Sequence, residues 1–308
     1  MTRKSKRREG LYERIGKAGV ALLLAGLLLL AGALGASAES IFESAAVTTA
    51  YSNRASERAA VTAVYLDGEE IHRGECVIVD SVTYVPLRKF CSLFADCSFS
   101  WNGKTQTATV TANGLTMTVQ QGAAYITSNG HFYYTVGKVL NRNGSLYVPI
   151  RPLARTFNVA LTWNAARRCV ELSTKDRLTP FVAWAAYNED DVYWLSRIIS
   201  AESRGEPLEG QIAVGNVVLN RVRSSAYPNT IYGVIFDRKH GTQFSPVSFG
   251  TIYNPPAASS VIAAKICLEG YTLSKDILFF MNPRLATSSW ISKNRPYAFT
   301  IGSHDFYR

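Results

Sequence analysis

Hydrophobic residues between Asp191 and Ser203 recur at helical spacing. Leu195, Ile198 and Ile199 precede Glu202 by seven, four and three residues, so one helical face carries all four side chains. A second helical run extends from Leu208 to Val222. The pattern therefore predicts two helices joined by a short break, with Glu202 pointing inward near the end of the first.

The residues that flank these runs indicate where the helices begin and end. Asn188 and the three acids after it are typical of a helix cap, because acids are stabilised at the positive end of the helix dipole. Gly205 can take the left-handed conformation that ends a helix, and Pro207 fits the opening turn of the next one. We expect this break to hold Glu202 near a cleft.

An earlier part of the chain, residues 61–174, shows strand patterns instead. Thr105 to Thr111 and Leu115 to Val119 alternate polar and apolar residues. Hairpin turns with positive φ are predicted at Asp67-Gly68, Asn102-Gly103, Asn113-Gly114, Asn129-Gly130 and Asn143-Gly144. This region is predicted to be mostly antiparallel β.

The same region contains an internal duplication. Tyr84-Val85-Pro86-Leu87-Arg88 recurs as Tyr147-Val148-Pro149-Ile150-Arg151, and each copy precedes a short helical piece, a Trp-Asn pair and a strand. We expect two repeats in residues 61–174, a linker over 175–188 and a mainly helical domain over 189–308. The fold class predicted for the whole chain is α+β.

The repeated motifs resemble the copper amine oxidase N-terminal-like stalk domain. That resemblance implies a spacer or wall-attachment module without chemistry of its own. His72 and His131 are isolated in the sequence, and isolated histidines are more often surface or hydrogen-bonded core residues than metal ligands. No metal site and no cofactor are expected.

The first 38 residues have the features of an export signal. A basic start is followed by an uncharged run of 17 residues, Ala18 to Leu34, and by Ala36-Ser37-Ala38, where we expect cleavage. That run is at the short limit for crossing a bilayer, which leaves an uncleaved membrane anchor open. Residues 39–60 are predicted to be a flexible tether, and the protein is expected to be secreted or wall-associated.

The net charge of the chain favours one class of binding partner. Removing residues 1–38 takes away seven Lys/Arg and two acids, so the formal charge falls from +10 to +5. The remaining positive charge suits an anionic polymer such as peptidoglycan, whereas basic stripes with stacking motifs for nucleic acid are absent from the sequence.

Five cysteines without zinc-ligand spacing are predicted to be mostly buried and unpaired, although Cys91 and Cys97 form a possible disulfide.

Glu202 is the residue best suited to chemistry. A carboxyl surrounded by Leu and Ile loses hydration, which raises its pKa from about 4.3 toward about 6, the range of a general acid. Asn216 and Asn220 share one face of the second helix, where we expect structural hydrogen bonds.

The segment Ala201-Glu202-Ser203-Arg204-Gly205-Glu206-Pro207, with the helical run after it, resembles the signature of the SleB-type cell-wall hydrolases, also called spore cortex-lytic enzymes. Further similar motifs follow in order at Tyr227 to Ile231, Gln243 to Val247, Asn282-Pro283, Ala286 to Ser288, Arg295-Pro296 and Ile301 to Tyr307. The resemblance implies a lysozyme-like domain that cleaves glycan strands after N-acetylmuramic acid as a lytic transglycosylase, with Glu202 as its acid. One acid suffices because the sugar's own C6 hydroxyl attacks.

Eight further residues are candidates for substrate binding: Arg204, Glu206, Gln243, Phe244, Ser245, Asn282, Trp290 and Arg295. Glu206 has four open interpretations: holding Arg204, orienting substrate, capping the second helix, or being the acid itself. Phe244 is expected to form an aromatic wall. Trp290 is either a stacking platform or core filler, and Arg295 is suited to a carboxylate.

Two alternative functions stay open. An amidase that cuts between muramic acid and the stem peptide usually needs a metal, and no HExxH run occurs; His240 and His304 provide too few ligands. A non-catalytic wall-binding protein is the other alternative, against which the intact acid motif argues. The sequence does not distinguish spore cortex from vegetative wall as the substrate.

Overall fold

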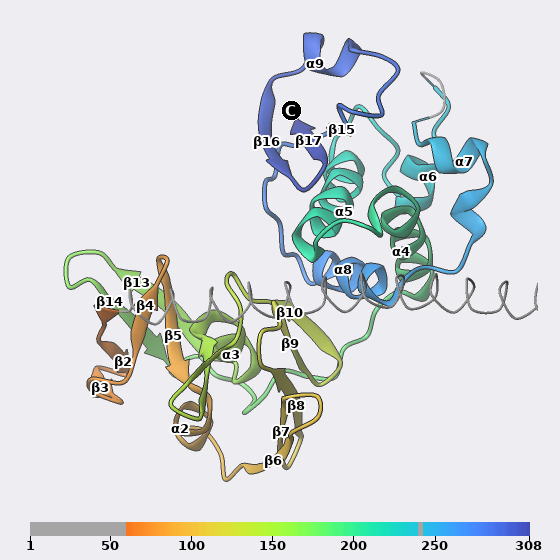
Figure 1. Cartoon of the computed structure of the whole chain (residues 1–308). Coiled ribbons are helices and arrows are strands. Elements are labelled where there is room, and N and C mark those ends of the chain that lie inside the picture. Colours follow the sequence, from red (N-terminus) through yellow and green to blue (C-terminus); the bar gives the residue numbers. More distant parts are fainter. Residues whose placement is uncertain (1–59, 240–242) are drawn as a thin grey trace, which may run out of the picture. The chain divides into compact units, whose positions relative to one another are not determined.

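The computed structural model describes residues 60–239 and 243–308 of the 308-residue chain. The predicted signal peptide and all of the tether except Ala60 lie outside the described residues. A β-rich region is followed by a mainly helical one, which confirms the α+β class (Figure 1). Within the described ranges, no helix combines the length and apolarity needed to cross a membrane.

The β-rich region consists of three sheets. The first has the order β1 (Ala60–Val61), β4 (Val77–Val79), β5 (Val82–Pro86), β12 (Ser145–Pro149) and β11 (Leu140–Arg142). The second is a meander of β6 (Ser98–Asn102), β7 (Thr107–Ala112), β8 (Leu115–Gln120), β9 (Tyr125–Ser128) and β10 (His131–Tyr134). The third has the order β13 (Ala160–Asn164), β14 (Cys169–Ser173), β2 (Val64–Leu66) and β3 (Glu69–Ile71). Pairing is mostly antiparallel, as predicted, and β14 with β2 is parallel.

The two repeats have the same local structure and pair with each other. Each has a strand, a short helix and a further strand, as β5, α2 (Leu87–Ser92) and β6 in the first and β12, α3 (Ile150–Thr156) and β13 in the second. β5 and β12 are antiparallel, with Val85 opposite its counterpart Val148. Both valines are fully buried. The repeats are therefore related by a local two-fold axis through this pair.

The hairpin turns follow the sequence prediction in part. Asp67-Gly68 has positive φ at both residues, 50° and 94°, as the type I′ turn requires, and Asn129-Gly130 and Asn143-Gly144 behave alike. At Asn102-Gly103 the prediction was wrong, since neither residue has positive φ. The Asn102 side chain instead accepts hydrogen bonds from the amides of Lys104 and Thr105, and the positive φ moves to Gln106.

The mainly helical region packs three longer helices together: α4 (Glu189–Ser203), α5 (Leu208–Arg223) and α8 (Ala258–Leu268). Shorter helices are α6 (Ile231–Ile235), α7 (Ser245–Ser248), η1 (Thr251–Tyr253) and α9 (Trp290–Asn294). A small antiparallel sheet of order β15 (Phe279–Met281), β17 (His304–Tyr307) and β16 (Tyr297–Ile301) completes the region.

Close packing of these helices explains two features of α5. A Cβ at Gly215 would lie 2.7 Å from Cys267 Sγ and 2.9 Å from Ile199 Cδ1, so only glycine permits this approach. Asn216 donates to the carbonyl of Tyr271 and accepts from the Leu273 amide, while Asn220 donates to two further carbonyls. The predicted structural role of both asparagines is confirmed.

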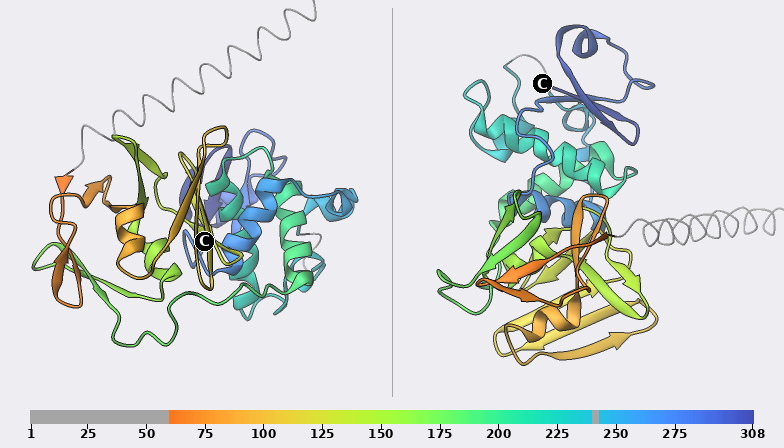
Figure 2. Two further views of the ribbon diagram at one scale, coloured as in Figure 1. Left: turned by 90° about the horizontal axis from the view of Figure 1, so that it is seen from below. Right: turned by 90° about the vertical axis from the view of Figure 1, so that its left-hand side faces the viewer.

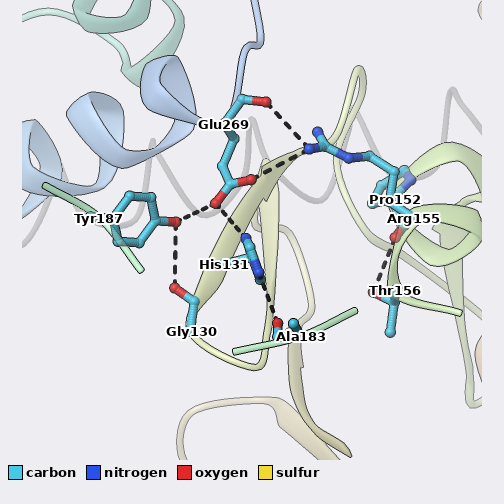
Figure 3. Close-up of polar contacts among 8 residues, drawn as sticks. All are labelled: Gly130, His131, Pro152, Arg155, Thr156, Ala183, Tyr187 and Glu269. Carbon is cyan, nitrogen blue, oxygen red and sulfur yellow. Dashed lines mark hydrogen bonds and ion pairs between the residues drawn. The ribbon is translucent and has the colours of Figure 1, made fainter. Parts of the chain in front are cut away.

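Glu269, just after α8, connects the helical region to the β-rich region (Figure 3). Its carboxyl accepts a hydrogen bond from Tyr187 at 2.5 Å and lies 2.7 Å from His131 Nδ1 and 3.4 Å from Arg155. His131 Nε2 lies 2.9 Å from the Ala183 carbonyl, so its ring faces two acceptors and donates to both only when doubly protonated. His131 is thus a hydrogen-bonded residue of this contact.

Further contacts connect the helical region to the β-rich region. Phe132 and Tyr134 of β10 pack against the core of the helical region, and β10 lies beside α8 (Figures 1 and 2). Within the predicted linker, the Val182 and Ala185 amides donate to the Thr156 and Asn129 carbonyls. The segment therefore runs along the β-rich region, while the domain boundaries themselves stay a prediction.

All five cysteines are unpaired, and four of them are buried: Cys76, Cys91, Cys169 and Cys267. Burial raises the pKa of the Cys76 thiol to about 12. These residues therefore act as small hydrophobic side chains, and the possible Cys91–Cys97 disulfide is not formed.

Candidate active site

Glu202 lies in the last turn of α4, on the face that the spacing predicted. Leu195, Ile198 and Ile199 are fully buried on that face, while Glu202 itself is half-buried. The helix begins as expected, because the Asn188 side chain accepts a hydrogen bond from the Asp191 amide at 3.0 Å. The structure therefore presents this carboxyl at the end of a well-anchored helix.

The surroundings of Glu202 favour its protonated form. Burial raises the pKa of Glu202 from 4.5 to about 7, and Arg221 opposes the shift only in part. Among the described residues, none donates a hydrogen bond to this carboxyl or forms an ion pair with it. The direction of the predicted shift is confirmed, and its size exceeds the expected rise toward 6.

The break between α4 and α5 has a different structure from the one predicted. Arg204 closes α4 in the right-handed helical region, and Gly205 does not have positive φ, so the expected left-handed glycine stop was wrong. Pro207 is extended, with ψ at 154°, and precedes α5 directly. Proline lacks the amide that would continue the helix, and it thereby separates the two helices.

Glu206 holds this break against the β16–β17 turn. The Ser303 amide donates to Glu206 Oε2 at 2.9 Å, the Ser303 hydroxyl donates to Oε1, and His304 Nδ1 lies 3.5 Å from Oε1. Partial burial raises the pKa of Glu206, but the Ser303 hydrogen bonds and His304 outweigh it and leave the pKa below its usual value. Glu206 is therefore an ionised acceptor and unsuited to donating a proton.

Arg221 was missed by the sequence reasoning, although the signal was present. It follows Val214, Val217 and Val218 by seven, four and three residues, the same spacing that picked out Glu202. Arg221 is 5% exposed, and burial lowers its pKa, opposed by Tyr227, Asp237 and Glu202. Arg221 on the second helix and the half-buried Glu202 on the first are thus close enough for each to affect the pKa of the other.

Arg221 contacts two of the predicted substrate-binding residues, Gln243 and Phe244. Arg221 donates to the Leu278 carbonyl at 2.8 Å and to Gln243 Oε1 at 3.5 Å. Its guanidinium carbon lies 5.1 Å from the ring centroid of Phe244. Phe244 is 2% exposed, which corrects the expectation of an aromatic wall: the ring packs in the core and has no open face for a sugar.

Trp290 and Arg295 form an exposed cluster with Phe279. Trp290 is 52% exposed, which argues for a platform and against core filler. The Arg295 guanidinium carbon lies 4.4 Å from the Phe279 centroid and 5.2 Å from that of Trp290. Phe279 also contacts Arg221, whose guanidinium carbon lies 5.5 Å from the ring centroid. Through Phe279 the cluster is connected to Arg221.

For the remaining candidates, no side-chain contact with this group is found among the described residues. Arg204 and Ser245 are exposed, and the Arg204 side chain makes no hydrogen bond or ion pair with the described residues. Asn282 caps its own turn, since its side chain accepts from the Arg284 amide at 3.0 Å. No group of three or more potential metal ligands is gathered within residues 60–239 and 243–308.

Comparison with known proteins separates the chain into two matched regions. Residues 205–307 match the cell wall hydrolase family, and residues 65–172 match the copper amine oxidase N-terminal domain. The catalytic domain of the germination-specific lytic transglycosylase SleB from Bacillus anthracis is 38% identical, covering 40% of this chain and 98% of that one, with a TM-score of 0.37. Residues 205–307 are therefore similar to a cell wall hydrolase domain.

Curated relatives of the cell wall hydrolase domain agree. The spore cortex-lytic enzyme of Bacillus cereus is 39% identical over 120 residues, 39% of this chain and 45% of the relative. That of Bacillus subtilis is 38% identical over 120 residues and is covered to 38%. The chain thus spans less than half the length of these relatives. The family match starts just after Glu202, whose role stays a prediction.

Proposed function

We propose that this protein degrades peptidoglycan by cleaving the glycan strand after N-acetylmuramic acid, as a lytic transglycosylase with Glu202 as general acid and base. The observation that carries the proposal is the half-buried position of Glu202 at the end of α4, without a hydrogen-bond donor among the described residues, and this burial raises its pKa to about 7. A carboxyl with this pKa is protonated in part at neutral pH and transfers the proton efficiently in both directions.

The reaction balances with one carboxyl. Glu202 donates its proton to the glycosidic oxygen as the bond from C1 of the muramic acid to that oxygen breaks. The C6 hydroxyl of the same sugar then attacks C1, and its proton passes to the Glu202 carboxylate. The products are a 1,6-anhydro sugar and a free hydroxyl on the departing sugar, and no water is consumed.

Arg221 acts between the two proton transfers of this reaction, when Glu202 is ionised. While Glu202 is ionised, the buried cation on α5 stabilises it electrostatically, and the attraction is already visible as the Arg221 effect on the pKa of Glu202. In a partly buried site such a charge acts with less screening than in water. Substrate positioning falls to the exposed Trp290 and Arg295, since sugars pack on indole rings and guanidinium groups bind carboxylates.

The substrate places the activity outside the cytoplasm. Relatives named spore cortex-lytic enzyme and cell wall hydrolase share the domain, so peptidoglycan of the wall or cortex is the proposed partner. Export through the N-terminal signal, with the uncleaved anchor as its alternative, fits this location.

The test compares Glu202→Gln with Glu209→Gln, a control at an exposed acid in the first turn of α5. We expect Glu202→Gln to lose about 10²–10⁴-fold in the rate of glycan cleavage, and the control to keep the wild-type rate within about twofold. Mass spectrometry of the wild-type products should show anhydro-muropeptides. Near-normal cleavage by Glu202→Gln contradicts the acid assignment, and release of free stem peptides contradicts the reaction in favour of an amidase.

A further inference from the structure

A cavity of about 960 Å³ lies in the β-rich region, where residues of both repeats line it, and neither Glu202 nor Arg221 is among them. Its lining includes Arg151, Trp163 and Arg168 of the second repeat and Glu269 of the cell wall hydrolase domain. The role of this cavity is therefore separate from the proposed chemistry.

The first repeat serves as an internal comparison. There, the guanidinium carbon of Arg88 lies 4.2 Å from the ring centroid of Phe99, so the arginine is covered by a ring. The position equivalent to Phe99 in the second repeat is Leu161, and the arginine equivalent to Arg88 is Arg151. Arg151 has no ring or carboxylate against it among the described residues, and it lines the cavity instead. The two copies thus differ in this respect: a ring covers Arg88, whereas no ring covers Arg151 among the described residues.

The charge around the cavity is unbalanced. Four arginines line it: Arg151, Arg155, Arg167 and Arg168. Arg155 is paired with Glu269 at 3.4 Å and Arg167 with Glu171 at 3.4 Å. Arg151 and Arg168 are exposed and have no acidic partner within the described ranges. The cavity therefore offers two free guanidinium groups to an anionic ligand.

An exposed aromatic ring accompanies these charges. Trp163 is 46% exposed and lines the cavity, whereas its first-repeat counterpart Trp101 is 52% exposed and lies outside it. The indole ring gives a flat apolar surface on which the C–H face of a sugar packs, and guanidinium groups bind carboxylates in a bidentate manner. Sugar and carboxylate together are what a glycan strand with peptide side chains presents.

We propose that this cavity is a second peptidoglycan-binding site, in which Trp163 stacks on a sugar and Arg151 and Arg168 hold stem-peptide carboxylates. The proposal rests on the proposed function for its choice of polymer. The second repeat then provides the aromatic ring and the two guanidinium groups, while residues of the first repeat form part of the cavity wall. The β-rich region then anchors the protein on the polymer that the other domain cuts.

The experiment uses the full chain with Glu202→Gln, so that binding is measured without degradation, on purified peptidoglycan freed of covalently attached phosphate polymers. We expect Trp163→Ala and Arg151→Ala each to weaken retention at least about fivefold. The matched controls Trp101→Ala and Arg88→Ala, at the equivalent first-repeat positions, should stay within about twofold. Thermal unfolding checks that each variant is folded, and Arg168→Ala provides a second charge variant.

Two results overturn the inference. The first is equal retention of the Trp163 and Trp101 variants, and the second is retention only on wall that still carries its phosphate polymers. Failure of the proposed function is distinguishable, because it is measured separately as muropeptide release by chains with native Glu202. Trp163-dependent binding without any such release leaves the second site standing and removes the catalytic assignment.

Discussion

The two ends of the α4–α5 break hold carboxyl groups in opposite electrostatic states. Glu202 and Glu206 are four residues apart and both are half-buried. Glu202 has no hydrogen-bond donor among the described residues, and burial raises its pKa to about 7. Glu206 receives the Ser303 amide and hydroxyl, and its pKa falls below the usual value despite burial.

The difference shows that donors, and not burial alone, decide which acid keeps its proton. A shift from 4.5 to about 7 corresponds to about 3 kcal/mol of differential interaction between the two protonation states. Two hydrogen bonds to a charged group are worth a similar amount in the opposite direction. Hydrogen bonds from the β16–β17 turn therefore keep Glu206 ionised. Glu202 receives none from the described residues and stays available for acid catalysis.

The largest expected effect is on the pH dependence of cleavage, which tests the state of Glu202. Since the acid must carry its proton, activity should fall about tenfold per pH unit above about 7, or about 100-fold by pH 9. Initial rates on purified peptidoglycan between pH 5 and pH 9 measure this limb. An undiminished rate at pH 9 would contradict the raised pKa.

A smaller effect, on the free energy of unfolding, is expected when Glu206 is replaced by an uncharged residue. Glu206→Gln replaces an ionised acceptor opposite the Ser303 amide, so we expect a loss of about 1–3 kcal/mol in the free energy of unfolding at neutral pH. Because the pKa of Glu206 is depressed, the wild-type contribution is lost as pH falls through the folded-state pKa, and the two proteins should converge in acid. Denaturant unfolding at pH 7 and pH 3 checks this, with Glu209→Gln as the control.

The smallest expected effect is on the pH dependence of stability, and it arises from the burial of Glu202. A raised carboxyl pKa gives stability that is present below the unfolded pKa of about 4.5 and is lost as pH rises through about 7. Solvent around the half-buried carboxyl reduces the ideal value of about 3 kcal/mol, so Glu202→Gln should be about 1–2 kcal/mol more stable than wild type at pH 8.5 and equal to it at pH 4. Thermal or denaturant unfolding at both values measures it, and a variant less stable at pH 8.5 would refute the burial argument.

Local sequence patterns predicted much of the fold and part of the site. The spacing around Glu202, the Asn188 cap and the repeated Tyr-Val-Pro motif are local signals, and the structure follows them. The Gly205 and Asn102-Gly103 predictions failed because another local device was available at each place: an adjacent proline at Pro207, and the Asn102 side chain that caps its own turn.

Long-range contacts were the part that local patterns did not contain. The bond from Ser303 to Glu206 joins residues far apart in sequence, and the burial of Phe244 depends on how its loop packs on Arg221 and Phe280. His131 was read as isolated for the same reason, since its partner Glu269 belongs to another region. Arg221 is different, because the helical spacing that revealed Glu202 would have revealed it too.

The pairing of β5 with β12 has a consequence for the origin of the β-rich region. Because Val85 faces its own counterpart Val148, the edge that each repeat offers is complementary to itself. A single repeat without its sister would leave that strand edge bare, and two separate copies would meet there with the same register, as an isologous dimer. The present chain has the geometry of such a dimer fused into one polypeptide, after which the copies were free to diverge at Phe99 and Leu161.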